Sequence, residues 1–443
     1  MKNYTKDDVR RVVEEEDVEF IRLQFTDLFG NLKNMAITAG QLEKALENRC
    51  MFDGSSVDGF GDPTGSDMYL YPDTNTMNIF PWRPQHGKVA RLICDVYTRD
   101  RKPYGGDPRY VLKRAMAEAE KMGYSLNVGP ECEFFLFQTD ENAQPTTIAN
   151  DRGGYFDLGP VDQGENARRD MVLTLEEMGF DIESSHHEAA PAQHEIDFKY
   201  DKALATADNI MTFKLTVKTI ARRHGLHATF MPKPKSDTQG SGMYLSMSLE
   251  KDGKNIFADK NDPEGISEDA RYFIGGLLSH IRGMCAVQNP LVNSYKRLVP
   301  GYEAPVYAGW GRGNCSQVIR VPHREEENVR VELRSPDSAA NPYLAIAVAL
   351  MAGLDGIKNK ILPPAAVDRD PVGMSAEERK TYGTDRLPED LNTAIDEMLR
   401  DKLITDTLGE RVTAAFVQAK RKEWREYNEE VSDWEVKRYL NRY

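Results

Sequence analysis

Carboxylates that alternate along short, otherwise apolar stretches are the feature that most limits what this chain can fold into. Glu131 and Glu133 lie two positions apart in a stretch rich in aromatic and branched residues. Successive side chains of a strand point to opposite faces, so these two carboxylates are expected to project from the same face. Like charges on a mostly buried strand are costly unless a cation neutralises them. The pattern therefore predicts a cation site, with a solvated sheet face as the alternative for any one strand.

Two further segments strengthen this interpretation. Arg330, Glu332 and Arg334 occupy alternate positions, and the two residues between them are apolar. A third segment carries Glu188 and, further along, Glu195. Oxygen ligands of this kind suit Mg2+ or Mn2+. Together the three segments favour a divalent-metal site that handles phosphate.

The composition fits a large enzyme and excludes several other classes of protein. A chain of 443 residues has room for roughly two to three domains. No apolar run reaches the ~18 residues of a membrane span, and no apolar region follows Lys2, so no signal peptide is expected. The net charge of −14 argues against general binding to nucleic acid or acidic membranes. The five scattered cysteines contain no C-x-x-C pair and fit reduced thiols in a cytoplasm.

The expected elements divide the chain into two unequal parts. Residues 1–105 should begin with a helix capped by Thr5 and Asp8, followed by strands near 18–25, 32–38, 77–81 and 89–97. Residues 106–443 should combine strands that carry the carboxylates with helices, including those expected over 110–122 and 207–224. The first part is interpreted as a small β-rich domain, and the second as a mixed sheet with inward carboxylates and outer helices.

Several longer motifs resemble those of type I glutamine synthetases, especially the shorter bacterial form. The run NSYKRLVPGYEAP, from Asn293 to Pro305, is too specific to match by chance, and MFDGSS (51–56), SSHHE (184–188) and AANPYL (339–344) match as well. The resemblance covers nearly the whole chain. It implies an α+β fold with an N-terminal β-grasp-like domain and a catalytic domain in which helices cover an antiparallel sheet. It also implies ATP-dependent formation of glutamine from glutamate and ammonium through γ-glutamyl phosphate.

The resemblance implies a set of metal ligands. Phosphorylation of a carboxylate brings ATP close to another anion, and two Mg2+ or Mn2+ ions supply the positive charge that this requires. By resemblance, the first ion would be held by Glu133, Glu188 and Glu195, and the second by Glu131 and Glu332.

The resemblance also implies contacts with the substrates. The expected glutamate contacts are Arg297, Arg334, Gln239 and Gly240, and the expected ATP contacts are Glu183, Ser246, Ser248 and Arg330. The expected catalytic residues are Asp53, Glu303 and Arg320. Asp53 would attract ammonium and help to remove its proton from across a subunit contact. Glu303 would belong to a flap that closes over the acyl phosphate and excludes water.

Each of these roles has a simpler alternative in the sequence itself. Asp53 precedes Gly-Ser-Ser and could be an ordinary turn or cap, and Glu303 could be a solvated loop acid. The adjacent His186 and His187 should face opposite ways on a strand, so packing roles are favoured over a zinc site. The segment Gly240 to Gly242 would by itself be a weak signal for a phosphate loop.

Three positions depart from the family pattern at the expected phosphate centre. Tyr244 stands where the family has a His that binds the second ion, and a neutral phenol with a pKa of about 10 is a poor ligand. Gln239 replaces an Asn. Cys315 replaces a phosphate-facing Arg, a loss that can reduce phosphoryl transfer by ~10³-fold, and Arg312 lies nearby. The acidic run 325–327 adds negative charge in a loop that the family often places near the nucleotide.

Three classes of function follow from these observations. The chain could be a glutamine synthetase with a remodelled second-metal site, a related γ-glutamyl ligase for another amine, or a non-catalytic sensor or assembly protein. The retained carboxylates and arginines favour an enzyme, and glutamine synthesis is the expected activity. The resemblance further implies a homo-oligomer of two stacked hexameric rings, and it leaves a regulatory protein partner open.

Overall fold

The computed structural model describes residues 3–61, 66–83, 86–323 and 328–443. The acidic run 325–327 therefore lies outside the described residues. The first elements are α1 (Lys6–Glu15), β1 (Val18–Thr26), β2 (Leu32–Thr38), a 3-10 turn (Ala39–Gln41), α2 (Leu42–Leu46), β3 (Cys50–Asp53), a second 3-10 turn (Gly54–Ser56), β4 (Asp67–Ile79) and β5 (Lys88–Thr98).

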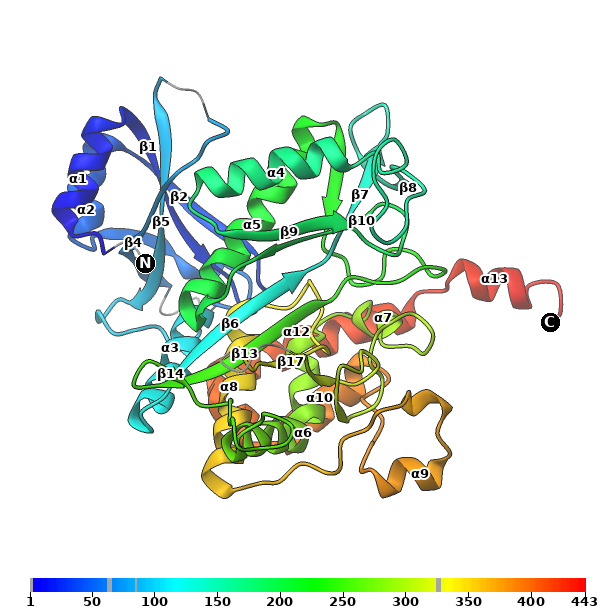
Figure 1. The fold of residues 1–443 in the computed structure, drawn as a ribbon. Coiled ribbons are helices and arrows are strands. Elements are labelled where there is room, and N and C mark those ends of the chain that lie inside the picture. Colours follow the sequence, from blue (N-terminus) through cyan, green and yellow to red (C-terminus); the bar gives the residue numbers. More distant parts are fainter. Residues whose placement is uncertain (1–2, 62–65, 84–85, 324–327) are drawn as a thin grey trace.

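These strands form one sheet with α1 and α2 packed against one face (Figure 1). The strand order is β2-β1-β5-β4-β3, in which β1 and β5 are parallel and the other neighbours are antiparallel. Helix α1 begins with the expected capping box, because Thr5 and Asp8 satisfy each other's backbone N–H groups. Ile21 and Leu23 of β1 alternate inward and are fully buried. The expected β-grasp-like fold is confirmed.

The remaining elements follow from residue 108. They are α3 (Pro108–Lys121), β6 (Ser125–Cys132), β7 (Phe134–Thr139), β8 (Pro145–Ala149), α4 (Glu165–Glu177), β9 (Ile182–His187), β10 (Gln193–Phe198), β11 (Asp201–Lys202), α5 (Ala203–Arg223), β12 (Leu226–Thr229), β13 (Met243–Lys251), β14 (Lys254–Asn255), α6 (Glu268–Gln288), α7 (Ser294–Arg297), β15 (Trp310–Arg312), β16 (Ile319–Val321), β17 (Val331–Leu333), α8 (Pro342–Asn359), a 3-10 turn (Pro371–Gly373), α9 (Ala376–Thr381), α10 (Leu391–Arg400), α11 (Lys402–Leu408), α12 (Glu410–Glu429) and α13 (Asp433–Tyr439).

The expected sheet of this part is divided into two. One sheet has the order β12-β7-β10-β9 with β8 beside β7, and the other has the order β11-β6-β13-β17-β16-β15 with β14 beside β13. The chain passes from one sheet to the other at Glu133, whose backbone N–H donates to the carbonyl of Gly242. All neighbours are antiparallel except β15 and β16. Glu131 and Glu133 therefore lie at the boundary between the two sheets.

Helices α6 and α8 form the buried helical layer behind the second sheet (Figure 1). They approach so closely that glycine is required at the contact. A Cβ atom on Gly276 would lie 2.1 Å from the carbonyl oxygen of Ala352, and one on Gly356 would lie 2.0 Å from that of Tyr272. Helix α13 instead extends away from the rest of the chain (Figure 1).

A single arginine joins the small sheet to the larger part. Arg109 of α3 forms ion pairs with Asp73 of β4 at 2.8 Å, Asp95 of β5 at 2.6 Å and Asp208 of α5 at 2.8 Å. Because all four side chains are mostly buried, these pairs hold the two parts in a defined relative position. Within the described ranges, no helix combines the length and apolar character needed to cross a membrane.

Candidate active and metal site

Seven acidic side chains, including Glu303 and Asp370, line one cavity of about 710 Å³ where the two sheets of the larger part meet, and the other five lie in or beside β6, β9 and β10. These five are Glu131, Glu133, Glu188, Glu195 and Asp197. Glu131 ends β6 and Glu133 occupies the break that follows, so the two carboxylates project into the same cavity as predicted, although the strand is interrupted between them. The three sequence segments that carry acidic residues therefore converge in space.

The β9–β10 hairpin places two of these acids. Glu188 follows β9 directly, and Glu195 lies on β10 opposite His186 in the antiparallel register. Asp197 is two positions beyond Glu195 and shares its face. Asp197 was not predicted from the sequence, although the same rule of alternate positions that was applied to Glu131 and Glu133 would have found it.

Three of the carboxylates are close enough to share one cation. Ligand oxygens of Glu133, Glu188 and Glu195 all lie within 4.8 Å of one another, and none of these residues is more than 9% exposed. Burial, followed by the charge of Glu133, raises the pKa of Glu188 to about 7. Burial and the charge of Asp197 raise the pKa of Glu195. Such crowding disfavours the ionised state of every member until a cation neutralises the group. The donor set is therefore suited to Mg2+ or Mn2+.

The two ligands expected for the second ion, Glu131 and Glu332, have different neighbours from those of the first three carboxylates. Glu332 is 1% exposed, and its carboxylate is already bound by Arg334 at 2.5 Å and by Arg320 at 3.3 Å. Glu131 lies alone nearby, and burial followed by the charge of Glu332 raises its pKa to about 8. Glu332 thus has two guanidinium partners, whereas no Arg or Lys side chain of the described residues forms an ion pair with Glu133, Glu188 or Glu195, and only His186 lies near Glu188, at 3.2 Å.

Tyr244 is tied into the same network. It pairs with Glu131 across β13 and β6, its ring lies 4.2 Å from the guanidinium of Arg334, and its hydroxyl forms a hydrogen bond with Glu133. Burial raises the pKa of this phenol above its usual value, so it stays neutral. Tyr244 therefore holds Arg334 over its ring and contributes no anionic ligand.

A small inner pocket continues the cavity towards α7. Gln239, Gly240 and Arg297 line it together with Glu303. Arg297 is 2% exposed, and its terminal N–H groups donate to the backbone carbonyls of Ser335 at 2.9 Å and Arg334 at 3.2 Å. Gly240 is required here, since a Cβ atom at this position would lie 2.2 Å from the carbonyl oxygen of Pro232.

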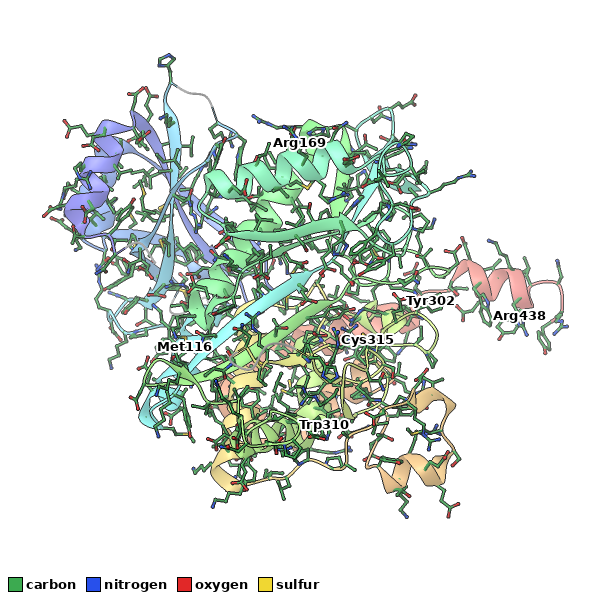
Figure 2. The ribbon with its side chains drawn as sticks, in the orientation of Figure 1. Met116, Arg169, Tyr302, Trp310, Cys315 and Arg438 are labelled. Carbon is green, nitrogen blue, oxygen red and sulfur yellow. The ribbon has the colours of Figure 1, made fainter. Side chains whose placement is uncertain are left out.

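Glu303 is the acidic residue of the loop that borders both the cavity and the inner pocket. Its φ of 60° lies in the left-handed region, which is unusual for a residue other than glycine. Lys233 lies 3.7 Å from the ring centre of the adjacent Tyr302, which also lines the inner pocket (Figure 2). The loop is thus held over the site in a strained conformation, as is common at functional sites.

The residues expected to contact ATP lie on one face of β13 and β17. Ser246 pairs with Glu332 and Gly129, and the same register places Ser248 beside Arg330. Both serines are buried, and Arg330 stacks over Tyr200 at 4.2 Å. Glu183 instead lies exposed on β9 and does not line the cavity.

Of the expected catalytic residues Arg320 and Asp53, only Arg320 lines the cavity. Arg320 lines it and pairs with Glu332. Asp53 lies exposed at the end of β3, does not line the cavity, and caps the following turn by accepting from the N–H of Ser55 at 2.9 Å. The Ser55 hydrogen bonds lower the pKa of Asp53. Asp53 thus has the capping role that was given as its alternative. Within one chain it does not line the carboxylate cavity.

The lost arginine is not replaced by a neighbour. Cys315, labelled in Figure 2, is exposed and lines the cavity. Arg312 points elsewhere, because its Nη2 atom contacts Nδ1 of His323 at 3.4 Å and it does not line the cavity. The cavity wall therefore carries a thiol at the position where the family pattern has a guanidinium.

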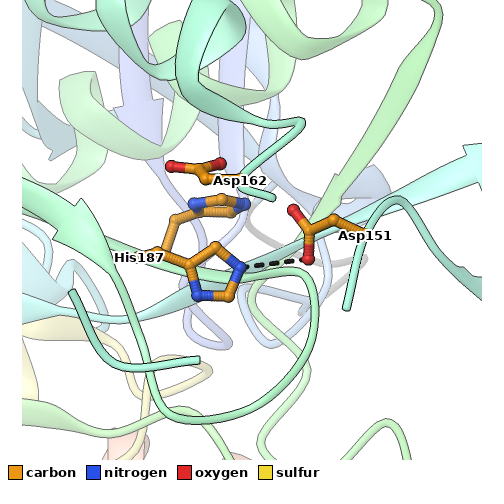
Figure 3. A group of neighbouring side chains, drawn as sticks. Asp151, Asp162 and His187 are labelled. Carbon is orange, nitrogen blue, oxygen red and sulfur yellow. Dashed lines mark hydrogen bonds and ion pairs between the residues drawn. The ribbon is translucent and has the colours of Figure 1, made fainter. Parts of the chain in front are cut away.

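A second cluster of acids and histidines includes His187, the residue before Glu188 (Figure 3). Asp151, Asp162, His187 and His194 have ligand atoms within 4.8 Å of one another and are all buried. Arg168 lies among them, 2.7 Å from Asp162 and 2.9 Å from Nδ1 of His194. We call these five residues the buried ion-pair cluster.

The proton positions argue against a metal in this cluster. A guanidinium can only donate, so Nδ1 of His194 accepts and Nε2 carries the hydrogen. His187 donates from Nδ1 to the carbonyl of Glu188 at 2.6 Å and from Nε2 to Asp151 at 3.0 Å, which makes it an imidazolium. Burial is the largest single effect and lowers the pKa of His187, but the hydrogen bonds to Asp151 and Glu188 and the charges of Asp151 and Asp162 together raise it above its usual value. The two cations and two carboxylates are thus already matched. His186 faces the cavity instead, so the two histidines face opposite ways as predicted.

The buried ion-pair cluster braces the hairpin that carries the metal carboxylates. Asp151 also accepts from the N–H of Ala192 at 2.9 Å, in the turn between Glu188 and Glu195. Ala192 has a φ of 65°, so this bond holds a strained turn in place. Asp151 was not singled out in the sequence because its partners lie 36 and 41 positions away.

Comparison with known proteins gives consistent matches over the whole chain. Residues 17–99 match the family model described as glutamine synthetase, beta-Grasp domain, and residues 105–439 match glutamine synthetase, catalytic domain. The glutamine synthetase of Clostridium saccharobutylicum is 60% identical over 443 residues, all of both chains. That of Staphylococcus aureus (strain MW2) is 54% identical over 443 residues, which are all of this chain and 99% of its own length.

Two solved structures share the fold. A complex of GmaS with ADP superposes with a TM-score of 0.89 at 32% sequence identity, covering 98% of this chain and 99% of the other. The Plasmodium falciparum glutamine synthetase, determined by cryo-electron microscopy, superposes with a TM-score of 0.87 at 25% identity and covers 99% of both chains.

The metal site can be tested by calorimetric titration with Mn2+, with and without ATP. We expect one tight site, which Glu188→Gln abolishes, and a second site that is much weaker because Arg334 already neutralises Glu332. Tyr244→His should strengthen the second site, whereas the matched change Tyr244→Phe should not. Two equally tight sites in the unaltered protein without ATP would show that Tyr244 has no such effect.

The brace can be tested by thermal unfolding. Asp151→Ala removes one member of a buried charge pair, a change that costs about 3 kcal/mol, so the melting temperature should fall by several degrees. Asp157→Asn is the matched control, because Asp157 lies in the same loop, is exposed, and its side chain accepts one hydrogen bond among the described residues, from the N–H of Gly154. Equal shifts for the two variants would contradict the bracing role of Asp151.

Proposed function

The chain belongs to the glutamine synthetase family, and we propose that its carboxylate-lined cavity is where ATP, glutamate and ammonium react to give glutamine. The observation that carries this proposal is the convergence of seven acidic side chains with Arg320 and Arg334 in one cavity of a chain that matches the catalytic domain of the family. A ligase for another amine or a non-catalytic protein is not favoured, since relatives at 60% and 54% identity over the whole chain are glutamine synthetases.

The acids of the cavity would hold the divalent ions. Glu133, Glu188 and Glu195 are assigned to the first ion, and Glu131 and Glu332 to a weaker second one. Mg2+ or Mn2+ bound there would neutralise the phosphate oxygens of ATP and lower their repulsion towards the glutamate carboxylate. The raised pKa values of Glu131 and Glu188 support this assignment, because such groups favour a cation at neutral pH.

Glutamate would be bound at the inner pocket. Arg297 and Arg334 are assigned to its carboxylates, for which a planar guanidinium fork is geometrically suited, and Gln239 and Gly240 to its amino-acid end. Arg334 would have to exchange its bond to Glu332 for the substrate, which should lower its affinity for glutamate. The proximity of Gly240 to Arg297 supports this assignment.

ATP would lie along the face of β13 and β17. Ser246, Ser248, Arg330 and, from β9, Glu183 are assigned to nucleotide contacts. The ADP present in the GmaS complex, a close structural neighbour, supports nucleotide binding in this fold. Arg320 would face the transferred phosphate and stabilise its developing charge.

The acyl phosphate would need protection from water and a supply of ammonia. Glu303, on the strained loop at the mouth of the inner pocket, is assigned to the flap that closes over γ-glutamyl phosphate. Asp53 is assigned to attracting ammonium and removing its proton, with its carboxylate supplied by a neighbouring subunit. The exposure of Asp53 at a sheet edge supports a role across a contact.

The same reasoning implies a closed ring of chains. We propose two domains, 1–105 and 106–443, and two stacked hexameric rings in which the small domain of one chain meets the large domain of the next. Heterologous contacts that close give rings. We also propose a cytoplasmic location, supported by the five cysteines, which are all free thiols.

Assembly can be tested by light scattering and subunit mixing. The mass should be that of twelve chains. Asp53→Asn and Glu188→Gln should each inactivate the protein, yet mixed subunits should regain about a quarter of the unaltered rate, because about one interface in four keeps both residues intact. A monomeric mass, or mixtures as inactive as either parent, would rule out the role of Asp53 across a contact.

Turnover can be tested with glutamate, ammonium and ATP. We expect weak glutamine formation, because the phosphate centre has lost a guanidinium and an imidazole relative to the family pattern. Tyr244→His combined with Cys315→Arg should raise the rate by about tenfold or more, the scale of single charge-stabilising groups. The two changes should be non-additive, because both address one phosphate.

The matched control for this test is Tyr244→Phe with Cys315→Ser, which alters the same positions without adding either group and should leave the rate low. Brisk turnover of the unaltered protein would show that the substitutions are tolerated. A double reversion that binds nucleotide but stays inactive would instead support a non-catalytic role.

A further inference from the structure

A second cavity of about 710 Å³ lies at the seam between the small sheet and the larger part. Its walls come from β4 and β5 on one side and from α3, α5 and β6 on the other. Met116, on the α3 wall, marks its position (Figure 2). None of the residues that line this seam cavity lines the carboxylate cavity. The two cavities are therefore separate sites.

The seam cavity is lined by a buried guanidinium that has no counter-ion. Arg91 of β5 is 4% exposed, and its Nε and Nη1 atoms are buried without a hydrogen-bond partner among the described residues. Arg91 is thus a charged side chain more than nine-tenths buried at the wall of a cavity. Burial lowers its pKa to about 10, so it remains charged at neutral pH.

Two acids of the seam cavity, Asp73 and Asp208, are already engaged by a different cation. Arg109 binds Asp208 through two nitrogens, at 3.0 and 2.8 Å, and also pairs with Asp73. Tyr343 donates to Asp208 as well, at 2.7 Å. Asp208, the acid whose charge acts most on Arg91, is therefore committed to Arg109. A buried unmatched guanidinium is costly unless an anion joins it.

The remaining walls define what kind of anion would fit. Met77, Met178 and Leu126 are almost fully buried and line the cavity with Met116 and Leu204, which provides an apolar surface. Asp73, Glu120, Asp201 and Asp208 also line it, so a multiply charged anion would be repelled. One unmatched positive charge beside an apolar wall suits a monoanion with an apolar body. The volume lies within the range typical of small-molecule sites, roughly 300 to 1,000 Å³.

We propose that the seam cavity binds a small organic monocarboxylate, with the carboxylate on Arg91 and the apolar body against the methionine-rich wall. The site lies beside Arg109, the residue that joins the two parts of the chain. Occupancy would therefore add a contact between the small sheet and the larger part. The proposal does not depend on the activity assigned to the carboxylate cavity.

Isothermal titration of the whole protein with hexanoate tests this proposal. ATP and glutamate are present in excess throughout, so that the carboxylate cavity is occupied. We expect saturable binding of one hexanoate per chain, with much weaker or absent binding of hexanol and of inorganic phosphate. Hexanol lacks the charge, and phosphate lacks the apolar body and carries more negative charge.

Two variants probe the two halves of the site separately. Arg91→Gln removes the charge and should weaken hexanoate binding by about tenfold or more, as expected for loss of a charge-assisted hydrogen bond. Met116→Trp fills the apolar part of the cavity without touching any charge and should weaken binding to a similar degree. Arg222→Gln, which alters an exposed arginine outside the seam cavity, is the matched control and should leave binding unchanged.

Several results would overturn the proposal. They are the absence of saturable binding to the unaltered protein at tens of millimolar hexanoate, equal binding of phosphate, and unchanged affinity in the variants. If Arg91→Gln does not fold, Met116→Trp decides alone, and unchanged affinity in that variant overturns the proposal.

Discussion

The structure depends on the mutual repulsion of carboxylates gathered where two sheets meet. Glu133 lies at the point where the chain leaves one sheet for the other, and Glu188 and Glu195 reach it from the β9–β10 hairpin of the sheet that contains β7. Buried acids at such distances oppose folding unless a cation is present. The surrounding structure must therefore hold the group together without help from the acids themselves. The buried ion-pair cluster does this for the hairpin, since Asp151 binds both His187 and the turn at Ala192.

At the expected second-ion site, arginines balance the buried carboxylate. Glu332 is matched by Arg334 and Arg320, and Arg334 rests over the ring of Tyr244. A phenol in this position keeps the guanidinium in place, whereas the imidazole of the family pattern would offer a ligand to a cation. The chain thus holds a guanidinium where a second ion would otherwise balance Glu332. Tyr244 is therefore linked through Arg334 both to an expected metal ligand, Glu332, and to an expected glutamate contact.

Ion pairs between buried side chains also connect the small sheet to the larger part of the chain. Arg109 takes up Asp73, Asp95 and Asp208, and so joins two parts of the chain through one guanidinium. That choice leaves Arg91, which lies close by, without a partner of its own. The carboxylate cavity and the seam cavity therefore share one feature, which is a buried charge that the described residues do not neutralise. A buried charge that the fold does not match marks a place where a ligand can bind.

The sequence by itself determined those features that depend on local pattern. The capping box at Thr5, the strand over 32–38, the β-grasp-like fold and the shared face of Glu131 and Glu133 follow from residue spacing and motif resemblance, because backbone geometry repeats every two or 3.6 residues. The family was evident for the same reason, in motifs such as that from Asn293 to Pro305. Asp197 could have been found by the same spacing rule. Only the tertiary structure decided the division into two sheets, the pairing of Glu332 with Arg334, the turning of Arg312 towards His323 and the bracing by Asp151. These contacts join residues far apart in the chain or select one of several partners within reach, and spacing along a sequence carries no information about which oppositely charged group a side chain will meet.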